Sequence, residues 1–479
     1  MNKRFYFNAL TAALGGVCMM GVAACASTAG SKSAGANAPA AVSGTYTFGT
    51  SKGAVAVSEY KAAKGIGFTV LNGGILSLKA GETGITASKS FQFKIAAPNG
   101  NYEVSAVTSA TEIISEAITE PVVYIDENGT KNSYNPPIDT ASGIPLIGVP
   151  KTIESGKSFY VAVCDGVLDL TFIRTDSDIT LSSITIKALP QEKREKPWLI
   201  AIGDSTTNLD YQDKCSWGNV IDKGMVQLPD SLGGFFNAGS SGADDITYIA
   251  WSRLEAALLH TAPGDYVTVN MGINQAKKYK IGLMEIAKSD SRGATLPLME
   301  KYYVEGILQR GGIPVITTIT ARGPYDKAGT PEDNGGLFYS AETKASEEVY
   351  VAGRRYASGQ TIPANTWSNS RHNGTYNIRL YDIANNYGLQ VIDLGIWGEG
   401  FFQSLTEENL KAFNAENNTD FATVFDMVKH GYYADQNHYH STLGVVFANY
   451  MLSCVDSLIK GTYSYPYWSY EPCYLKKAK

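Results

Sequence analysis

The sequence predicts an α/β fold, a three-layer αβα sandwich with a parallel sheet, preceded by an all-β sandwich region. Two pattern regimes along the chain carry this prediction. Residues 45–189 hold short alternating strands separated by turn dipeptides, which is typical of antiparallel sheets. From residue 197 the apolar runs become continuous and alternate with helical periodicity, which indicates parallel strands buried on both faces. The length of 479 residues suits two such regions, and a hydrophobic share of 44% can build both cores.

Composition narrows the possible partners. The formal net charge is −6, so no strongly basic surface follows and we expect no nucleic-acid partner. The 48 glycines and an aromatic share of 11% favour strands and tight turns over a helical bundle. No second long apolar run is apparent after the N-terminal one, which argues against a multi-span membrane protein.

The first 25 residues have the pattern of an export signal. A basic start precedes a mostly apolar stretch that ends in small residues before Cys25. This ending resembles a bacterial lipobox, so we expect residues 1–25 to be a lipoprotein signal peptide and Cys25 to be lipidated. Cys18 fits this motif less well because a bulky residue precedes it. A plain signal peptide, or a single helical anchor with an incidental Cys25, is the alternative.

Residues 26–44 are rich in Ala, Ser and Gly and predict a flexible linker. The protein would then meet a membrane only through an N-terminal lipid anchor, as a bacterial cell-envelope lipoprotein, or be secreted. Ala26 rather than Asp follows the cysteine, which mildly favours the outer membrane or the cell surface.

The β-sandwich region, residues 45–189, is predicted from strands that turn dipeptides separate. The expected strands span residues 91–95, 102–107, 159–163, 167–173 and 179–186. Turn signals lie at residues 98–101 and at Asp165-Gly166. The charged run 191–196 that follows is predicted to be a solvated linker.

The second region, residues 197–479, alternates buried strands with helices. The expected strands lie at residues 198–202, 235–236, 266–269, 313–319 and 389–394, and the helices at 246–260, 296–310, 377–387 and 441–459. In a parallel sheet of this kind the site lies beyond the carboxyl ends of the strands. Residues that directly follow each strand are therefore the candidates for the site.

Four blocks of such residues follow in order. Ser205 lies in the Gly-Asp-Ser run after the first strand, and Gly242 ends a glycine-rich bend after the second. Asn274 follows the third strand, and an Asp-x-x-His motif, Asp435 to His438, precedes the last helix. Each block alone is common in turns, but together they bring a nucleophile, a base and hydrogen-bond donors to one edge of the sheet.

These four blocks resemble the SGNH (GDSL-type) hydrolase family, and most of all its rhamnogalacturonan acetylesterase branch, over about residues 197–461. More loosely, residues 46–49 and 65–68 resemble the opening of a small β domain that often precedes such esterases. The resemblance implies an SGNH hydrolase fold for residues 197–479 and a carbohydrate-binding-like β sandwich before it.

The resemblance also implies residue roles. Ser205 would be the nucleophile, His438 its base, and Asp435 the residue that orients the imidazole. The backbone N–H groups of Ser205 and Gly242 and the side-chain amide of Asn274 would form the oxyanion hole. No metal or other cofactor is expected, since no zinc-type cysteine or histidine spacing is present.

Three departures from the family pattern bear on the site. Gln275 replaces the acidic residue that usually follows the conserved asparagine. The spacing after His438 is one residue longer than usual, which makes His440 a rival base, although only His438 has an aspartate three positions before it. Asp244 and its neighbour stand where a basic residue and a serine are common, and we expect them to cap a helix rather than to select substrate.

The function that follows is a serine carbohydrate esterase that removes acetyl groups from a polysaccharide, most plausibly acetylated pectin of the rhamnogalacturonan type. Gln275 motivates one alternative, a weakened or inactive carbohydrate-binding surface lipoprotein. An esterase or lipase acting on another acyl ester is a further alternative.

The sequence alone does not determine how the cysteines pair. Export would permit disulfides, and Cys454 and Cys473 are near enough in sequence to pair. Three pairings are possible among Cys164, Cys215, Cys454 and Cys473, and buried free thiols are the alternative.

Overall fold

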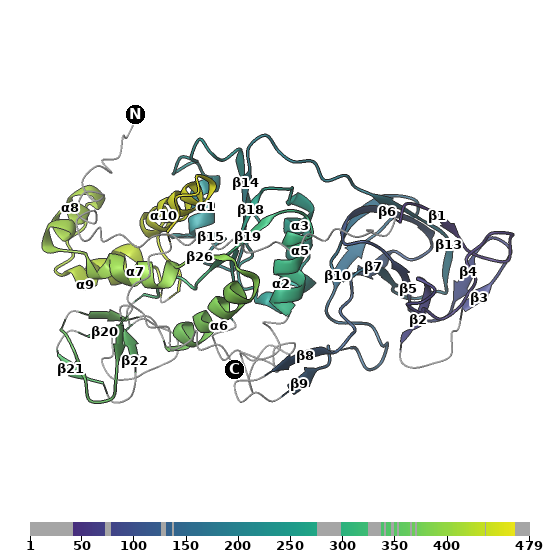
Figure 1. Ribbon diagram of the computed structural model, residues 1–479, viewed down its shortest axis with the longest axis horizontal. Helices are drawn as coiled ribbons and strands as arrows, with labels where there is room; N and C mark the ends of the chain where they lie inside the picture. Colours follow the sequence, from purple (N-terminus) through teal and green to yellow (C-terminus); the bar gives the residue numbers. More distant parts are fainter. Residues whose placement is uncertain are drawn as a thin grey trace. The chain divides into compact units, whose positions relative to one another are not determined.

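The computed structural model shows an α/β region and a β-rich region (Figure 1). The structure describes residues 42–71, 78–125, 131–136, 138–274, 298–323, 337–339, 342–345, 349–351, 354–364, 366–368, 371–435 and 437–464. The expected signal peptide, Cys25 and most of the expected linker lie outside the described residues, as do Gln275 and Cys473.

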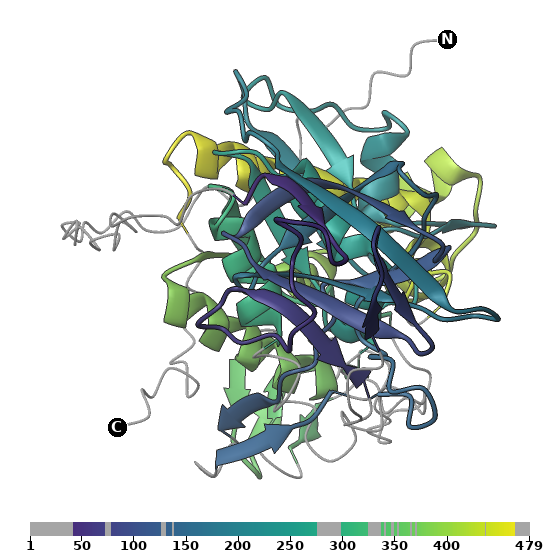
Figure 2. The same cartoon turned by 90° about the vertical axis from the view of Figure 1, so that its right-hand side faces the viewer.

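Two antiparallel sheets build the β-rich region, which faces the viewer in Figure 2. One has the order β11-β6-β13-β4-β3, with β1 also paired to β13, and the other has the order β10-β7-β12-β5-β2. The strands are β1 Gly44–Thr47, β2 Ile66–Val70, β3 Leu78–Ala80, β4 Ile85–Ala87, β5 Phe91–Ala96, β6 Gly100–Thr108, β7 Glu112–Ser115, β10 Val149–Thr152, β11 Ser158–Val163, β12 Val167–Phe172 and β13 Ile179–Ala188.

A single hydrophobic core joins these two sheets. Its centre is aromatic, with Phe48 in edge-to-face contact with Phe68 and Phe93 at ring-centroid distances of 5.6 Å. Turns carry the chain from one sheet to the other between β5 and β6 and between β11 and β12. Gly166 adopts φ +85 in the second of these turns, a conformation that glycine reaches without strain.

The α/β region contains one parallel sheet of the order β17-β14-β18-β19-β26. Its strands are β14 Trp198–Gly203, β17 Gly234–Asn237, β18 Tyr266–Asn270, β19 Ile313–Thr317 and β26 Gln390–Ile392. All five coincide with strands expected from the sequence, although β19 and β26 end two residues earlier than expected.

Alternate residues of the strands face different hydrophobic clusters, as the two-residue period of a strand requires. In β14, Leu199 and Ala201 join one cluster, while Ile200 and Ile202 join the other. Helices complete both clusters, so the sheet is covered on both faces. On the Ile200 face they are α2 Asp245–Ala250, α3 Arg253–His260, η3 Met299–Val304, α5 Glu305–Leu308 and α6 Arg371–Tyr387. On the Leu199 face they are α1 Trp217–Asp222, α7 Leu394–Gln403, α8 Glu407–Asn417, η4 Met427–Tyr432 and α10 Ser441–Ile459.

The strand order places a topological switch point between β14 and β18. The chain leaves β14 toward β17 on one side and returns to β18 on the other. Connections diverge at such a point and leave a crevice at the carboxyl ends of the strands, where open α/β sheets hold their ligands. Ser205 follows β14 and Asn274 follows β18, so both lie at the switch point.

Two predicted helices are interrupted. The helix expected at residues 246–260 breaks between α2 and α3, where Ser252 adopts a left-handed φ of +61. The helix expected at residues 296–310 consists of a π-helical segment, η3, followed by α5. The break at Ser252 has no Gly or Pro in the sequence to announce it, whereas Gly306 lies beside the change from η3 to α5.

The remaining elements are short. They comprise β8 Val122–Ile125, β9 Lys131–Tyr134, β15 Asp210–Tyr211, β16 Lys214–Cys215, β20 Leu337–Tyr339, β21 Thr343–Lys344, β22 Val349–Val351, β23 Arg354–Tyr356, β24 Thr361–Ile362, β25 Thr366–Ser368 and α9 Val424–Asp426. Most of them form two-stranded hairpins, and β15–β16 lies closest in sequence to Ser205.

The segment expected to be a solvated linker is instead tied down at Arg194. Its guanidinium lies 2.6 Å from Asp265 Oδ2, donates to the carbonyl of His260 and stacks 4.4 Å above the Trp198 ring. Asp265 is fully buried, so a cation is needed there to balance its charge. The prediction for this segment was therefore wrong at that residue.

Arg310 joins the β-rich region to the α/β region. Its side chain is fully buried and donates to Asn101 Oδ1 at 2.8 Å, and also to the carbonyl oxygens of Gly100 and Val163. A buried guanidinium is stable only when its donors find acceptors, and strands β6 and β11 supply them.

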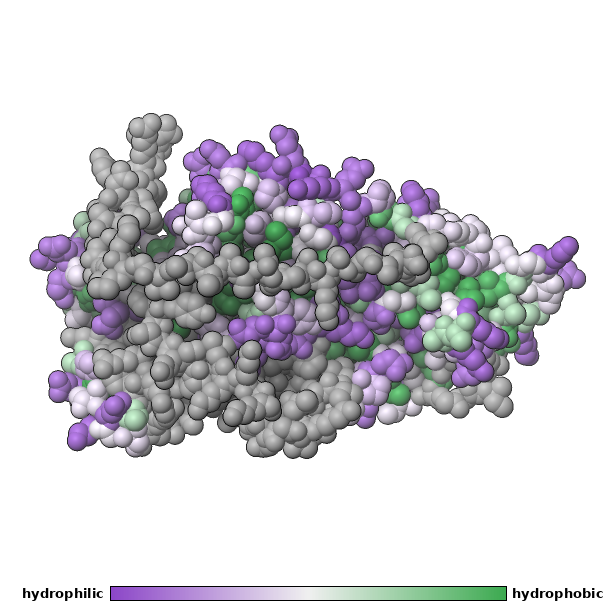
Figure 3. All heavy atoms as spheres, viewed as in Figure 1, coloured by the Kyte–Doolittle hydropathy of each residue, from purple (hydrophilic) through white to green (hydrophobic). Residues whose placement is uncertain are grey.

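The C-terminal helix α10 is long and apolar enough, by length and composition, to cross a membrane, a run that the sequence analysis passed over. Eight of its residues are nevertheless buried in the protein, which makes it a core helix of the α/β region. On the face shown in Figure 3, hydrophilic and hydrophobic side chains are interspersed over the described surface.

Three cysteines within the described residues, Cys164, Cys215 and Cys454, are free and buried. The structure therefore favours buried thiols over pairings among these three, while a bridge from Cys454 to Cys473 lies beyond the described residues.

Candidate active site

Ser205 stands in the turn that directly follows β14, and it is buried. The turn is tight because Thr207 folds back over Gly203: a Cβ on Gly203 would lie 2.0 Å from Thr207 Oγ1. The carbonyl of Ser205 accepts a hydrogen bond from Ser216 Oγ, which fixes the turn from the opposite side. The local sequence therefore places one hydroxyl at the carboxyl end of β14.

Asp435 and His438 lie in a compact loop just before α10. The N–H groups of Ala434 and Asp435 both donate to the carbonyl of His438, at 2.9 and 3.1 Å. Asp435 Oδ1 accepts in turn from the N–H groups of Asn437 and His438. This loop closes on itself, so the imidazole of His438 projects from a fixed backbone.

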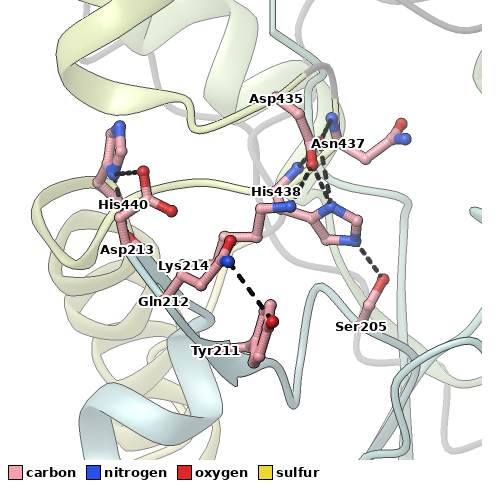
Figure 4. A network of polar contacts seen from close by, with 9 residues as sticks. All are labelled: Ser205, Tyr211, Gln212, Asp213, Lys214, Asp435, Asn437, His438 and His440. Carbon is pink, nitrogen blue, oxygen red and sulfur yellow. Dashed lines mark hydrogen bonds and ion pairs between the residues drawn. The ribbon is translucent and has the colours of Figure 1, made fainter.

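The structure brings Ser205, His438 and Asp435 together (Figure 4). Ser205 Oγ lies 2.9 Å from His438 Nε2, and His438 Nδ1 lies 2.8 Å from Asp435 Oδ2 and 3.0 Å from Oδ1. With Nδ1–H donating to the carboxylate, Nε2 is the acceptor for the serine hydroxyl, which is the arrangement a general base needs.

The rival histidine, His440, points elsewhere. Its Nδ1 lies 3.0 Å from the carbonyl oxygen of Asp213 and 3.7 Å from the Asp213 carboxylate. Figure 4 shows its ring turned away from Ser205. Of the two candidate bases, only His438 contacts the hydroxyl.

Asp435 stays ionised over a wide pH range. Partial burial by itself would raise the pKa of this carboxyl, but hydrogen bonds from His438 and Lys214 and from two backbone N–H groups outweigh it. The pKa of Asp435 is therefore held well below its usual range. Lys214, on the β15–β16 hairpin, lies with Nζ 2.8 Å from Asp435 Oδ2, a partner that the sequence analysis did not single out.

The loops that carry two of the expected oxyanion donors, Gly242 and Asn274, are in contact with each other. Gly242 adopts φ +79, so the bend that ends at this residue is one that glycine accepts without strain. Asn274 Nδ2 donates to the carbonyl of Ala243 at 2.7 Å, which holds its amide beside the Gly242 bend. A primary amide has a second hydrogen to donate, so this contact leaves Asn274 with donor capacity.

A side chain that was not predicted from the sequence connects the loops after β14 and β18 by hydrogen bonds. Asp204 Oδ1 accepts from the N–H and the hydroxyl of Thr206, and Asp204 Oδ2 accepts from the N–H of Ile273 at 3.3 Å. Asp204 thus links the loop after β14 to the loop after β18 that carries Asn274. The Gly-Asp-Ser run predicts where this carboxylate lies in the chain, but it does not predict the hydrogen bond to the loop after the neighbouring strand.

Beneath these loops lies a buried cation, Arg322, whose Nη2 donates to the carbonyl of Ile273 at 3.4 Å. Burial lowers the pKa of Arg322 to about 10, an effect that the nearby Asp204 carboxylate opposes. The charge of Arg322 balances that of Asp204 under the turn that bears Ser205.

Asp244 caps a helix, as expected. Its side chain accepts from the N–H groups of Ile246 and Thr247 at the start of α2. The N–H of Asp244 donates in turn to the hydroxyl of Thr247, which completes a capping box. Gln275 lies outside the described residues, so the effect of its departure from the family pattern stays a question for experiment. Among the residues that the structure describes, no cluster of three or more His, Cys, Asp or Glu could hold a metal ion.

Comparison with known proteins gives limited similarity. No family model matches the chain, and a search of curated proteins finds no match. Among solved structures, the chain is similar to the protein YxiM from Bacillus subtilis, with 17% sequence identity and a TM-score of 0.34, over 87% of this chain and 98% of that chain.

Two shorter solved structures are also similar. One is Axe2, an acetylxylan esterase from Geobacillus stearothermophilus, with 13% identity and a TM-score of 0.32 over 54% of this chain and 93% of that chain. The other is a member of the lipolytic protein G-D-S-L family from Veillonella parvula, with 14% identity and a TM-score of 0.27 over 53% of this chain and 96% of that chain.

Proposed function

We propose that this protein is a serine ester hydrolase of the SGNH type. The observation that carries the proposal is the contact of Ser205 Oγ with His438 Nε2 at 2.9 Å, between residues 233 positions apart in the chain. Asp435 holds the far nitrogen of the same ring. A hydroxyl, an imidazole and a carboxylate in series form the constellation that turns a weak nucleophile into an effective one.

The first half of the reaction makes an acyl-enzyme. Ser205 Oγ attacks the ester carbonyl while its proton passes to His438 Nε2, and the carbonyl oxygen becomes an oxyanion. The N–H groups of Ser205 and Gly242 and the amide of Asn274 would stabilise that charge, and one such donor typically contributes about 3 kcal/mol. His438 then returns the proton to the departing alcohol oxygen, and Asp435 stabilises the charged imidazole between the two transfers.

The second half restores the enzyme. Water attacks the acyl carbonyl and gives one proton to His438 Nε2, and a second oxyanion forms in the same position. When it collapses, the bond to Ser205 breaks, the serine oxygen recovers the proton, and the carboxylic acid leaves. Every proton in the cycle passes through His438, so no cofactor is required.

The substrate we propose is an acetylated polysaccharide, pectic rhamnogalacturonan, from which acetate is released. Its support is the resemblance of the four sequence blocks to that esterase branch and the β-rich region that precedes them. The lipobox-like segment ending at Cys25 supports a place at the bacterial cell envelope, where an extracellular polymer is accessible.

The test has two stages. Purified protein is first offered p-nitrophenyl acetate, and Ser205→Ala is expected to abolish turnover; equal turnover by this variant would disprove the proposal. A panel of acetylated polysaccharides then identifies the polymer by acetate release, and a series of esters of increasing acyl length tests for a lipid esterase. Tight binding of a polysaccharide without acetate release would favour an inactive binding protein.

A further inference from the structure

Lys214 makes a contact that the three expected catalytic residues do not require. Its Nζ lies 2.8 Å from Asp435 Oδ2, the same oxygen that lies 2.8 Å from His438 Nδ1. Figure 4 shows the lysine side chain reaching toward the carboxylate beside the imidazole. The side chains of Lys214 and Asp435 are 24% and 38% exposed, so water only partly screens the pair.

The position of Lys214 is fixed by backbone contacts rather than by the ion pair alone. The N–H of Cys215 donates to the carbonyl of Tyr439 at 3.0 Å, and His440 Nδ1 lies 3.0 Å from the carbonyl of Asp213. These two contacts flank Lys214 and tie the β15–β16 hairpin to the loop that carries His438. The lysine is therefore built into the site.

We propose that Lys214 is a positioning residue that holds Asp435 toward His438 and shifts the working range of this base to lower pH. The inference deepens the proposed ester hydrolysis and rests on it. Lys214 does not touch Ser205 in any contact of the described residues, so its action passes through Asp435.

The physical reason is a competition for one carboxylate. Asp435 favours the protonated, charged imidazole, and a cation on the same oxygen opposes that preference by Coulomb repulsion. The imidazole then stays neutral, and able to accept the proton of Ser205, at a lower pH than it would without the lysine. Lys214 also fixes the carboxylate, which keeps the Nδ1–H bond aligned.

Other charged and titratable groups near this pair have partners of their own. Burial raises the pKa of Tyr433 and Tyr439 well above its usual value, so both phenols stay neutral. The remaining groups are Asp210, paired with Lys223 at 2.6 Å, Asp213 at 3.7 Å from His440, and Asp204 beside Arg322. None of these contacts engages Asp435 or the ring of His438.

The test compares two lysines of the same neighbourhood. Lys214→Met removes the charge next to Asp435, and Lys223→Met removes a charge whose partner, Asp210, lies at the start of the same hairpin. For Lys214→Met, we expect the acid limb of the kcat/KM profile to move up by roughly half a pH unit to one unit. We expect kcat on the plateau to fall roughly two- to fivefold with KM unchanged. Lys214→Arg is expected to restore the acid limb, and Lys223→Met to leave it in place.

Titration of the His438 imidazole requires no ester substrate, so it tests this inference separately from the proposed function. The protein has five histidines, and labelled imidazole signals can be assigned to His438 with the His438→Gln variant. The titration midpoint of His438 is expected to rise in Lys214→Met and to stay in Lys223→Met. An unmoved midpoint together with an unmoved acid limb overturns the role of Lys214. A moved midpoint in a protein that hydrolyses no ester would instead overturn only the hydrolase proposal.

Discussion

The two parts of the candidate site, one around His438 and one around Gly242 and Asn274, are built in different ways. On the side of His438, charged side chains meet: Asp435 accepts from the imidazole and from Lys214, and it is partly exposed. On the side of Gly242 and Asn274, backbone groups and a neutral amide are held by the turn geometry. The first side should respond to charge and pH, and the second to changes in backbone conformation.

The largest expected effect on activity comes from a substitution on the charged side of the site. His438→Gln removes the base, and kcat/KM is expected to fall by about ten-thousandfold or more. His440→Gln is the matched control, because His440 stands two positions away and contacts Asp213 rather than Ser205. Ester hydrolysis by both variants gives the measurement, and an equal loss in the two would contradict the assignment of His438.

The next effect tests the neutral side. Asn274→Ala removes one of the proposed oxyanion donors, which is expected to lower kcat by about a hundred- to a thousandfold with little change in KM. Steady-state kinetics and thermal melting are measured together. A loss in melting temperature that fully accounts for the loss of activity would mean that Asn274 only holds Ala243.

A smaller effect sharpens the backbone argument. Gly242 and Gly224 both have left-handed φ values, +79 and +64, and a Cβ at either would meet nothing within 4 Å. Gly242→Ala and Gly224→Ala should each cost about 1–2 kcal/mol in the free energy of unfolding. Only Gly242→Ala should also lower kcat, by roughly tenfold, if its N–H is one of the proposed oxyanion donors and the added Cβ shifts that backbone. Equal kcat values in the two variants would remove Gly242 from the site.

The smallest effect concerns stability against pH. The pKa of Asp435 is lowered in the folded protein, so its ionised form contributes stability above the unfolded pKa of about 3.9. That contribution is lost as pH falls from there through the lower folded pKa. Wild type should exceed Asp435→Asn in urea stability at pH 7 by less than about 1 kcal/mol, since the group is well exposed. The difference should shrink below pH of about 4, and a difference that grew there would contradict the sign.

Sequence could predict part of the site because Ser205 and Asn274 follow β14 and β18, whose carboxyl ends a parallel sheet places side by side. Asp435 and His438 follow no strand of that sheet and were predicted from their motif before the last helix, and α10 begins and ends where its apolar period does. Their catalytic roles remain predictions for the experiments above. Lys214 could not be found in this way, because a lysine in a short polar hairpin carries no periodic signal.

Two predictions that failed, a continuous helix at 246–260 and a solvated linker at Arg194, failed for the same physical reason. The break at Ser252 and the anchoring of Arg194 depend on tertiary partners that local sequence does not encode. Packing of α2 and α3 in the hydrophobic core offsets the strain of the left-handed serine. The ion pair with the buried Asp265 holds the guanidinium of Arg194 in place. Local propensity favoured a continuous helix and a solvated linker at these places.

Arg310 has a consequence for how the protein melts. Its guanidinium is buried against carbonyl groups of the β-rich strands, so removing those strands would take away the acceptors of its N–H donors and uncover the surface of the α/β region that they cover. The two regions should therefore unfold together: calorimetry of the intact chain should show one cooperative transition, and the α/β region alone should be hard to express in soluble form.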